Sequence, residues 1–119
     1  MEITITHIGD KGIATVASDQ LVVNNVADAL DILGNCGYQG AAGIILYEQQ
    51  ITPEFFDLKT GIAGEILQKF STYQMKLAIV GAFEKYNSKA LKDFIYESNK
   101  AGRINFVADV EEAKARLSK

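Results

Sequence analysis

The segment richest in residues that could bind a ligand is 61-GIAGEILQKF-70. Gly61 and Gly64 stand at the start of an expected helix, where free N–H groups can hold an anion. The segment has neither the G-x-x-x-x-G-K-[ST] nor the G-x-G-x-x-G order that binds phosphate groups. Glu54 and Asp57 in the preceding loop would also repel an anion. The sequence therefore favours an amphipathic helix in which Gly64 permits close packing on a neighbouring element.

Polar side chains on and around this helix are the candidates for contact with a small molecule. Glu65 precedes Lys69 by four residues, the favourable order for an ion pair on a helix. Glu48, Glu65 or Glu97 could act as a general base if a pocket buried its carboxyl group. Such a pocket is expected between helix 61–72 and the carboxyl ends of the parallel strands. The candidate ligand-binding residues are Glu48, Thr60, Gly61, Gly64, Glu65, Gln68, Lys69 and Tyr73.

Histidine and cysteine are too scarce to predict a catalytic triad or a metal site. The only histidine, His7, falls on an alternating strand, and the only cysteine is Cys36. Neither a Ser-His-Asp set nor a spaced cluster of metal ligands can be assembled from these residues. We therefore expect no catalytic residue, no metal and no cofactor. A single cysteine cannot form an internal disulfide, which suits the reducing cytoplasm.

The charge distribution disfavours nucleic acid as a partner. The net charge is -3, with eight acids and one base in residues 1–58 and seven acids and eleven bases in residues 59–119. An acidic protein is a poor general ligand for nucleic acid. A basic line does run from Lys85 to Arg103, but Asp93 and Glu97 interrupt it, which is typical of a solvated helix face.

Hydrophobic periodicity predicts five strands. Residues 2–8 and 13–17 alternate in polarity on either side of a GDKG turn, which predicts a hairpin. The continuous apolar runs 43–47 and 76–81 are typical of parallel strands buried on both faces. A short strand is expected at 104–107.

Capping residues predict the helices between these strands. Helix starts are expected at Asn25, at Thr52-Pro53, at Asn87 or Ser88, and at Asp109, and helix ends at Gly34 and Gly102. The order is β-β-α-β-α-β-α-β-α. It predicts a single α/β domain over residues 1–119, with a five-stranded mixed sheet and about four helices.

Aromatic residues are dense near the middle of the chain. Phe55 and Phe56 are neighbours at an expected helix start, where adjacent side chains point about 100° apart. On such a helix, only one of the two rings can face the core. We therefore expect one of them to remain partly exposed or to lie in a contact between subunits.

Five motifs follow one another along the chain: FFDL (55–58), GIAGEILQKF (61–70) with Tyr73, KLAIVG (76–81), LKDFIYESN (91–99) and FVADVEEA (106–113). Together they resemble an uncharacterised bacterial family, domain of unknown function 4180. The order of elements also resembles the STAS fold of anti-sigma-factor antagonists and of lipid-binding STAS-like proteins. Those antagonists carry a phosphorylatable serine after the strand equivalent to 43–47, whereas 47-YEQQITPEFFDL-58 has no serine and only Thr52. A phosphorylation switch of that kind is therefore not expected.

Two functions are compatible with these observations. The leading hypothesis is a non-enzymatic cytoplasmic module that regulates or interacts with proteins and that self-associates or docks a partner. The alternative is a small-molecule or lipid-binding protein, conceivably a weak enzyme, with its pocket at the carboxyl rim next to helix 61–72. No insertion into a membrane is expected, because the longest apolar run is 41-AAGIILY-47.

Overall fold

The computed structural model describes residues 1–119. A five-stranded sheet has the strand order β1-β2-β3-β4-β5, and the predicted order of elements and mixed sheet are confirmed. Short 3-10 helices connect some elements. The strands are β1 (Glu2–Ile8), β2 (Lys11–Ala17), β3 (Ala41–Tyr47), β4 (Lys76–Val80) and β5 (Ile104–Val107), and the helices are α1 (Val26–Tyr38), α2 (Ile62–Thr72), α3 (Lys89–Ala101) and α4 (Val110–Leu117).

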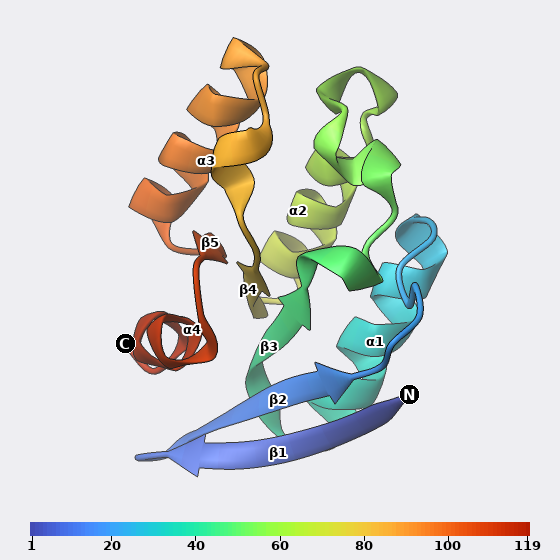
Figure 1. Ribbon diagram of the computed structural model, residues 1–119. Coiled ribbons are helices and arrows are strands. Elements are labelled where there is room, and N and C mark those ends of the chain that lie inside the picture. Colours follow the sequence, from blue (N-terminus) through green and yellow to red (C-terminus); the bar gives the residue numbers. More distant parts are fainter.

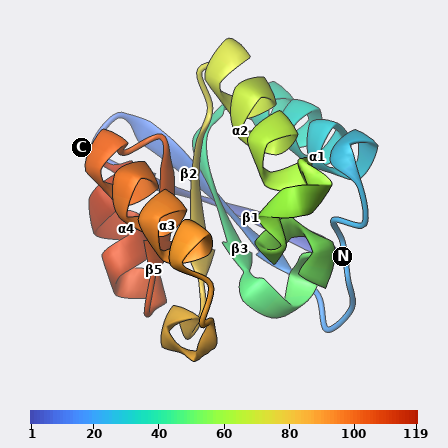
Figure 2. The same ribbon diagram turned by 90° about the horizontal axis from the view of Figure 1, so that it is seen from above.

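The helices cover the two faces of the sheet unequally. Only β1 and β2 pair antiparallel, and β2 to β5 are parallel neighbours in sequence order. Right-handed crossovers that always move to the next strand place their helices on one face, so α1, α2 and α3 lie together there. The helix α4 follows the last strand and packs on the opposite face (Figures 1 and 2).

The core has a large part and a small part, one on each face of the sheet. The larger cluster contains 21 buried residues, among them Ile44 and Leu77 together with side chains of α1, α2 and α3. The smaller contains seven, among them Ile45, Ala113 and Leu117. Because β3 alternates between the two clusters, both faces of the central strands are buried, as their continuous apolar sequences predict.

Polar caps fix the starts of the helices where the sequence predicts them. The side chain of Asn25 accepts from the Asp28 N–H at 2.9 Å, and Ser88 accepts from Leu91 N–H at 3.2 Å. Asp109 caps α4 in the same way. These bonds satisfy N–H groups that a helix start would otherwise leave without a partner.

The first helix is longer than predicted. Gly34 does not end it, and α1 continues to Tyr38 before the chain reverses at Gly40, where φ is +93°. The extra turn places Cys36 on the buried stripe that holds Ile32 and Ala29. Burial raises the pKa of the Cys36 thiol to about 11. Burying one more apolar side chain therefore outweighs the preference of Gly34 for a helix end.

The expectation that one ring of Phe55 and Phe56 stays exposed is wrong. Their exposed fractions are 1% and 7%. Pro53–Phe56 is a 3-10 helix, and both rings belong to the larger core cluster, where Phe55 lies near Phe106 and Phe56 near Phe83. The two rings meet edge to face at 5.0 Å, and Phe56 also stacks on Tyr86.

Gln50 ties the end of β3 to the end of β2. Its side chain is 1% exposed. The amide oxygen accepts from Tyr47 N–H at 2.9 Å, and the amide nitrogen donates to the carbonyls of Val16 at 3.0 Å and Ser18 at 3.2 Å. The side chain thus satisfies three main-chain groups just beyond the point where the β2–β3 pairing stops.

We predict that Gln50→Leu lowers the free energy of unfolding by about 3 kcal/mol, because it leaves buried main-chain groups without partners. Urea denaturation measures the change. The matched control is Gln49→Leu, since the neighbouring glutamine is exposed and makes no side-chain hydrogen bond within the chain. Equal stability of the two variants would contradict the assigned role of Gln50.

Candidate functional site

The carboxyl ends of β3 and β4 bring Glu48 and Gly81 together. Tyr47 and Val80 are paired at the ends of these parallel strands, so the residues that follow them leave the sheet side by side. A Cβ atom at Gly81 would lie 2.6 Å from Oε1 of Glu48 and 2.8 Å from its Cβ. Only glycine therefore lets the Glu48 side chain lie across the end of β4.

Two side chains from the turn after β4 hold the Glu48 carboxylate. Its Oε2 atom accepts a short hydrogen bond from the Tyr86 hydroxyl and lies 2.8 Å from the Lys85 ammonium. The Glu48 side chain is only 12% exposed, whereas Lys85 is 57% exposed. Removing a carboxylate from water is costly, and these two partners offset part of that cost.

Tyr86 acts in this site as a hydrogen-bond donor. Burial, the hydrogen bond to Glu48 and the negative charge of Glu48 all raise the pKa of its phenol above the ordinary value of 10. The phenol is therefore protonated at neutral pH, so it can donate a proton to an acceptor but does not serve as a phenolate base. Its ring stacks on Phe56 at 5.2 Å, and the Lys85 ammonium lies 5.4 Å from the ring centroid.

A surface pocket of about 340 Å³ opens beside this carboxylate. Its volume falls within the range of about 300–1,000 Å³ that is common for small-molecule sites. Apolar side chains form half of the lining, and the Glu48 carboxylate is its only acidic group. The lining residues are Leu21, Glu48, Gln49, Ile51, Pro53, Phe56, Lys85 and Tyr86.

A second pocket, of about 520 Å³, lies at the carboxyl ends of β4 and β5. The chain leaves β4 toward α3 and leaves β5 toward α4, which cover opposite faces, and ligand crevices form at such divergences. Its charged groups are mixed, however, and Glu112 is already bonded to the N–H of Ala108. This pocket lacks a buried charge comparable to Glu48.

The predicted residues near α2 lie apart from Glu48. None of Thr60, Gly61, Gly64, Glu65, Gln68, Lys69 and Tyr73 lines either rim pocket. The Thr60 hydroxyl instead donates to the carbonyls of Glu54 and Asp57 at 2.8 and 2.9 Å, which holds the turn before α2. Gly61, with φ at +79°, starts the helix in the left-handed region, where glycine is favoured.

Two expectations about α2 itself are wrong. Gly64 is exposed, and a Cβ atom there would meet nothing within 4 Å, so this glycine does not permit close packing. Glu65 and Lys69 also form no ion pair within 4.0 Å. Gln68 and Tyr73 are exposed, the latter by 60%. The helix contributes its apolar side to the core and leaves its polar side to solvent.

Sequence reasoning identified Glu48 but missed its two partners. The sequence places Lys85 in the basic line that ends at Arg103, and it gives no indication that Tyr86 contacts Glu48. The useful indication was the pairing of parallel strands, because the turn after β4 must pass the residue that ends β3. In this structure no group of three or more His, Cys, Asp or Glu side chains is arranged to hold a metal ion.

We predict that Glu48→Gln lowers the pKa of Tyr86 while leaving it above 10, because burial is the largest cause of the shift. NMR titration of ring-labelled tyrosine measures it, with Tyr86→Phe to assign the signal. Glu84→Gln is the control, since it removes the same charge from the same turn. Equal effects of the two variants would contradict a direct role of Glu48.

The same coupling gives a sign for stability against pH. The folded protein holds the Tyr86 proton more tightly than the unfolded chain, whose tyrosine pKa is about 10. The resulting stabilisation is complete below pH 10 and is lost as the pH rises through the higher folded-state pKa. Glu48→Gln is expected to flatten this alkaline loss in urea denaturation curves.

The sequence profile of a family described as Domain of unknown function (DUF4180) matches residues 8–117. The chain belongs to this family. Neither a curated protein nor a solved structure matches it. No helix in the structure combines the length and the apolar character needed to cross a membrane.

Proposed function

We propose that this member of the DUF4180 family binds a small organic cation in the pocket beside Glu48. The observation that carries the proposal is the position of the Lys85 ammonium, 2.8 Å from the Glu48 carboxylate and 5.4 Å from the centroid of the Tyr86 ring. A carboxylate and an aromatic face together are a favourable environment for an ammonium group. The position beside the Glu48 carboxylate and the Tyr86 ring is therefore suited to the amine of a ligand as well as to that of a lysine.

A ligand amine could displace the Lys85 ammonium from the Glu48 carboxylate. The Lys85 side chain is more than half exposed, and ion pairs of such side chains contribute only about 0–1 kcal/mol. A ligand that places its ammonium on Glu48 and its apolar part against Ile51 and Phe56 also removes apolar surface from water. That additional burial favours the ligand over the lysine.

The protein-interaction hypothesis has weaker structural support. Part of its support was the expectation that Phe55 or Phe56 is partly exposed or lies in a subunit contact, and both rings are buried within the chain. A cytoplasmic regulatory role and a STAS-like topology stay predictions. Binding at the carboxyl rim is supported by a largely covered carboxylate in an open pocket with apolar walls, which is the usual composition of a small-molecule site.

The test uses 2-phenylethylammonium as the probe and 2-phenylethanol as its uncharged analogue, with binding followed by NMR. We predict that Lys85→Ala binds the ammonium about ten-fold more tightly than the unmodified protein, because the competing cation is gone. Glu48→Gln is expected to abolish binding of the ammonium. Lys89→Ala, which removes an exposed lysine paired with Asp93, is the control and leaves the affinity unchanged.

Two outcomes would overturn the proposal. One is equal binding of the ammonium and the alcohol, which would show that charge plays no part. The other is the absence of chemical-shift changes at Tyr86 in the Lys85→Ala protein, which would place any binding elsewhere.

A further inference from the structure

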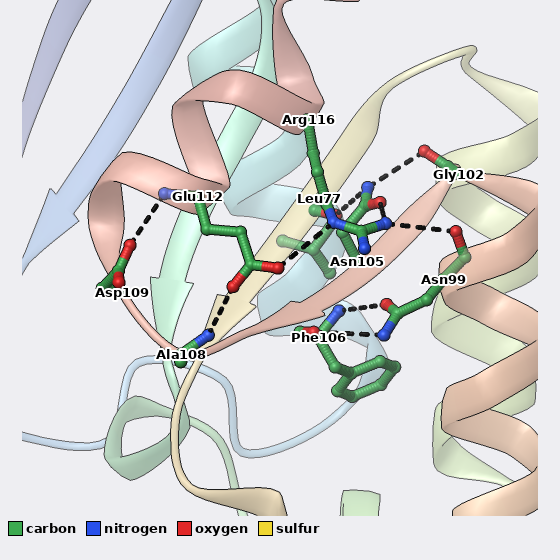
Figure 3. A network of polar contacts seen from close by, with 9 residues as sticks. All are labelled: Leu77, Asn99, Gly102, Asn105, Phe106, Ala108, Asp109, Glu112 and Arg116. Atoms are coloured by element: carbon green, nitrogen blue, oxygen red, sulfur yellow. Dashed lines mark hydrogen bonds and ion pairs between the residues drawn. The ribbon is translucent and has the colours of Figure 1, made fainter.

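The outer edge of β5 is closed by side chains of the chain itself. The amide of Asn99 accepts from the N–H of Phe106 at 2.7 Å and donates to its C=O at 3.2 Å, as a neighbouring strand would (Figure 3). Glu112 accepts from the next outward N–H, that of Ala108, at 3.1 Å. Both main-chain groups of Phe106 and the N–H of Ala108, which could receive another strand at β5, are therefore already occupied.

Arg116 holds this closure in place. Its guanidinium donates to the main-chain oxygen of Asn99 at 3.2 Å and to the side-chain oxygen of Asn105 at 3.3 Å, and it lies 3.6 Å from Glu112 (Figure 3). Asn105 is 1% exposed and also donates to the carbonyls of Leu77 and Gly102. The network joins α3, α4 and the edge strand β5, and each of these hydrogen bonds connects two residues of the same chain.

The opposite edge, β1, has no such closure. β1 is paired with β2 along Glu2–Ile8 in an unbroken register, with no bulge. Its sequence, EITITHI, contains no proline and no lysine, the residues that commonly block an edge. No side chain or loop forms a hydrogen bond to β1, and Figure 1 shows no helix outside it.

The register of the sheet identifies the main-chain groups that β1 leaves free. The N–H of Leu77 bonds to Arg103 in the β5 direction, and the direction alternates with each residue along a strand. The same alternation can be followed strand by strand from β4 through β3 and β2 to β1. It shows that the main-chain N–H and C=O groups of Ile3, Ile5 and His7 point toward the open edge. Three successive outward residues can exchange about six main-chain hydrogen bonds with an antiparallel partner.

We propose that β1 pairs with β1 of a second copy, about a two-fold axis through Ile5, to form a continuous ten-stranded sheet. An antiparallel pair about such an axis keeps each face continuous, so residues of equal parity lie opposite one another. Centring on Ile5 uses all three outward residues: Ile5 faces Ile5 of the second copy, and Ile3 faces its His7. Thr4 faces Thr6.

The side chains of β1 favour this occupant over an unrelated peptide. Ile3 and Ile5 are partly buried and pack against the main core, so two copies would join their apolar faces. On the other face the threonines provide matched β-branched pairs at the positions where opposing side chains lie closest. The same seven residues therefore supply both halves of the contact.

The test is a charge exchange at Thr4 and Thr6, which face the side of the sheet opposite Ile3 and Ile5. Native mass spectrometry and light scattering of the unmodified protein are expected to give a dimer. The double variant Thr4→Lys, Thr6→Lys and the double variant Thr4→Glu, Thr6→Glu each place like charges opposite one another, and each is expected to be monomeric. An equimolar mixture of the two restores a dimer with one copy of each.

Thr15→Lys is the matched control, because Thr15 pairs with Thr4 but lies one strand further from the edge. It is expected to remain dimeric. Circular dichroism of each variant checks that the fold is intact. A monomeric unmodified protein at high micromolar concentration would overturn the proposal, as would a dimeric lysine variant or a charge-matched mixture that stays monomeric.

Discussion

The structure depends on two central strands that are apolar on both faces. In β3 and β4, consecutive side chains such as Ile44 and Ile45 point to opposite sides of the sheet, and both are fully buried. A sheet of this kind needs cover above and below. Successive crossovers supply only one side, so the short helix α4 must close the other, and Gly43 gives it room, since a Cβ atom there would lie 3.2 Å from Leu117.

The candidate site follows from the same pairing. Parallel strands of matched register end together, and this brings Glu48 next to Gly81 although they are far apart in the sequence. The turn after β4 then has to pass over Glu48, which brings Tyr86 and Lys85 to its carboxylate. The geometry of the sheet thus creates a nearly buried charge at the rim. The pocket beside this charge has an apolar wall, to which Phe56 at the edge of the core contributes.

Local chemistry predicted the elements better than it predicted their surroundings. The caps Asn25 and Asp109, and Ser88 as one of two alternatives, were predicted because their hydrogen bonds reach only three residues along the chain. Glycines were less informative, because the role of a glycine is not set by its neighbours in sequence. Gly34 lies inside a helix that it was expected to end, and Gly64 faces solvent where close packing was expected. The side chains that surround Phe56 and the two partners of Glu48 could not be predicted in this way, because they come from segments that meet only in the folded sheet.

The two edges of the sheet differ in a way that limits growth. A sheet with two receptive edges can add copies at both sides and extend into a filament. Here Asn99 imitates a strand at β5, so β1 is the edge that offers an added strand an uninterrupted row of free main-chain groups. Once β1 is occupied by its own copy, the enlarged sheet ends in a closed β5 edge on each side. In the proposed dimer, the side chain of Asn99, whose main-chain oxygen is bound by Arg116, would therefore make assembly self-terminating.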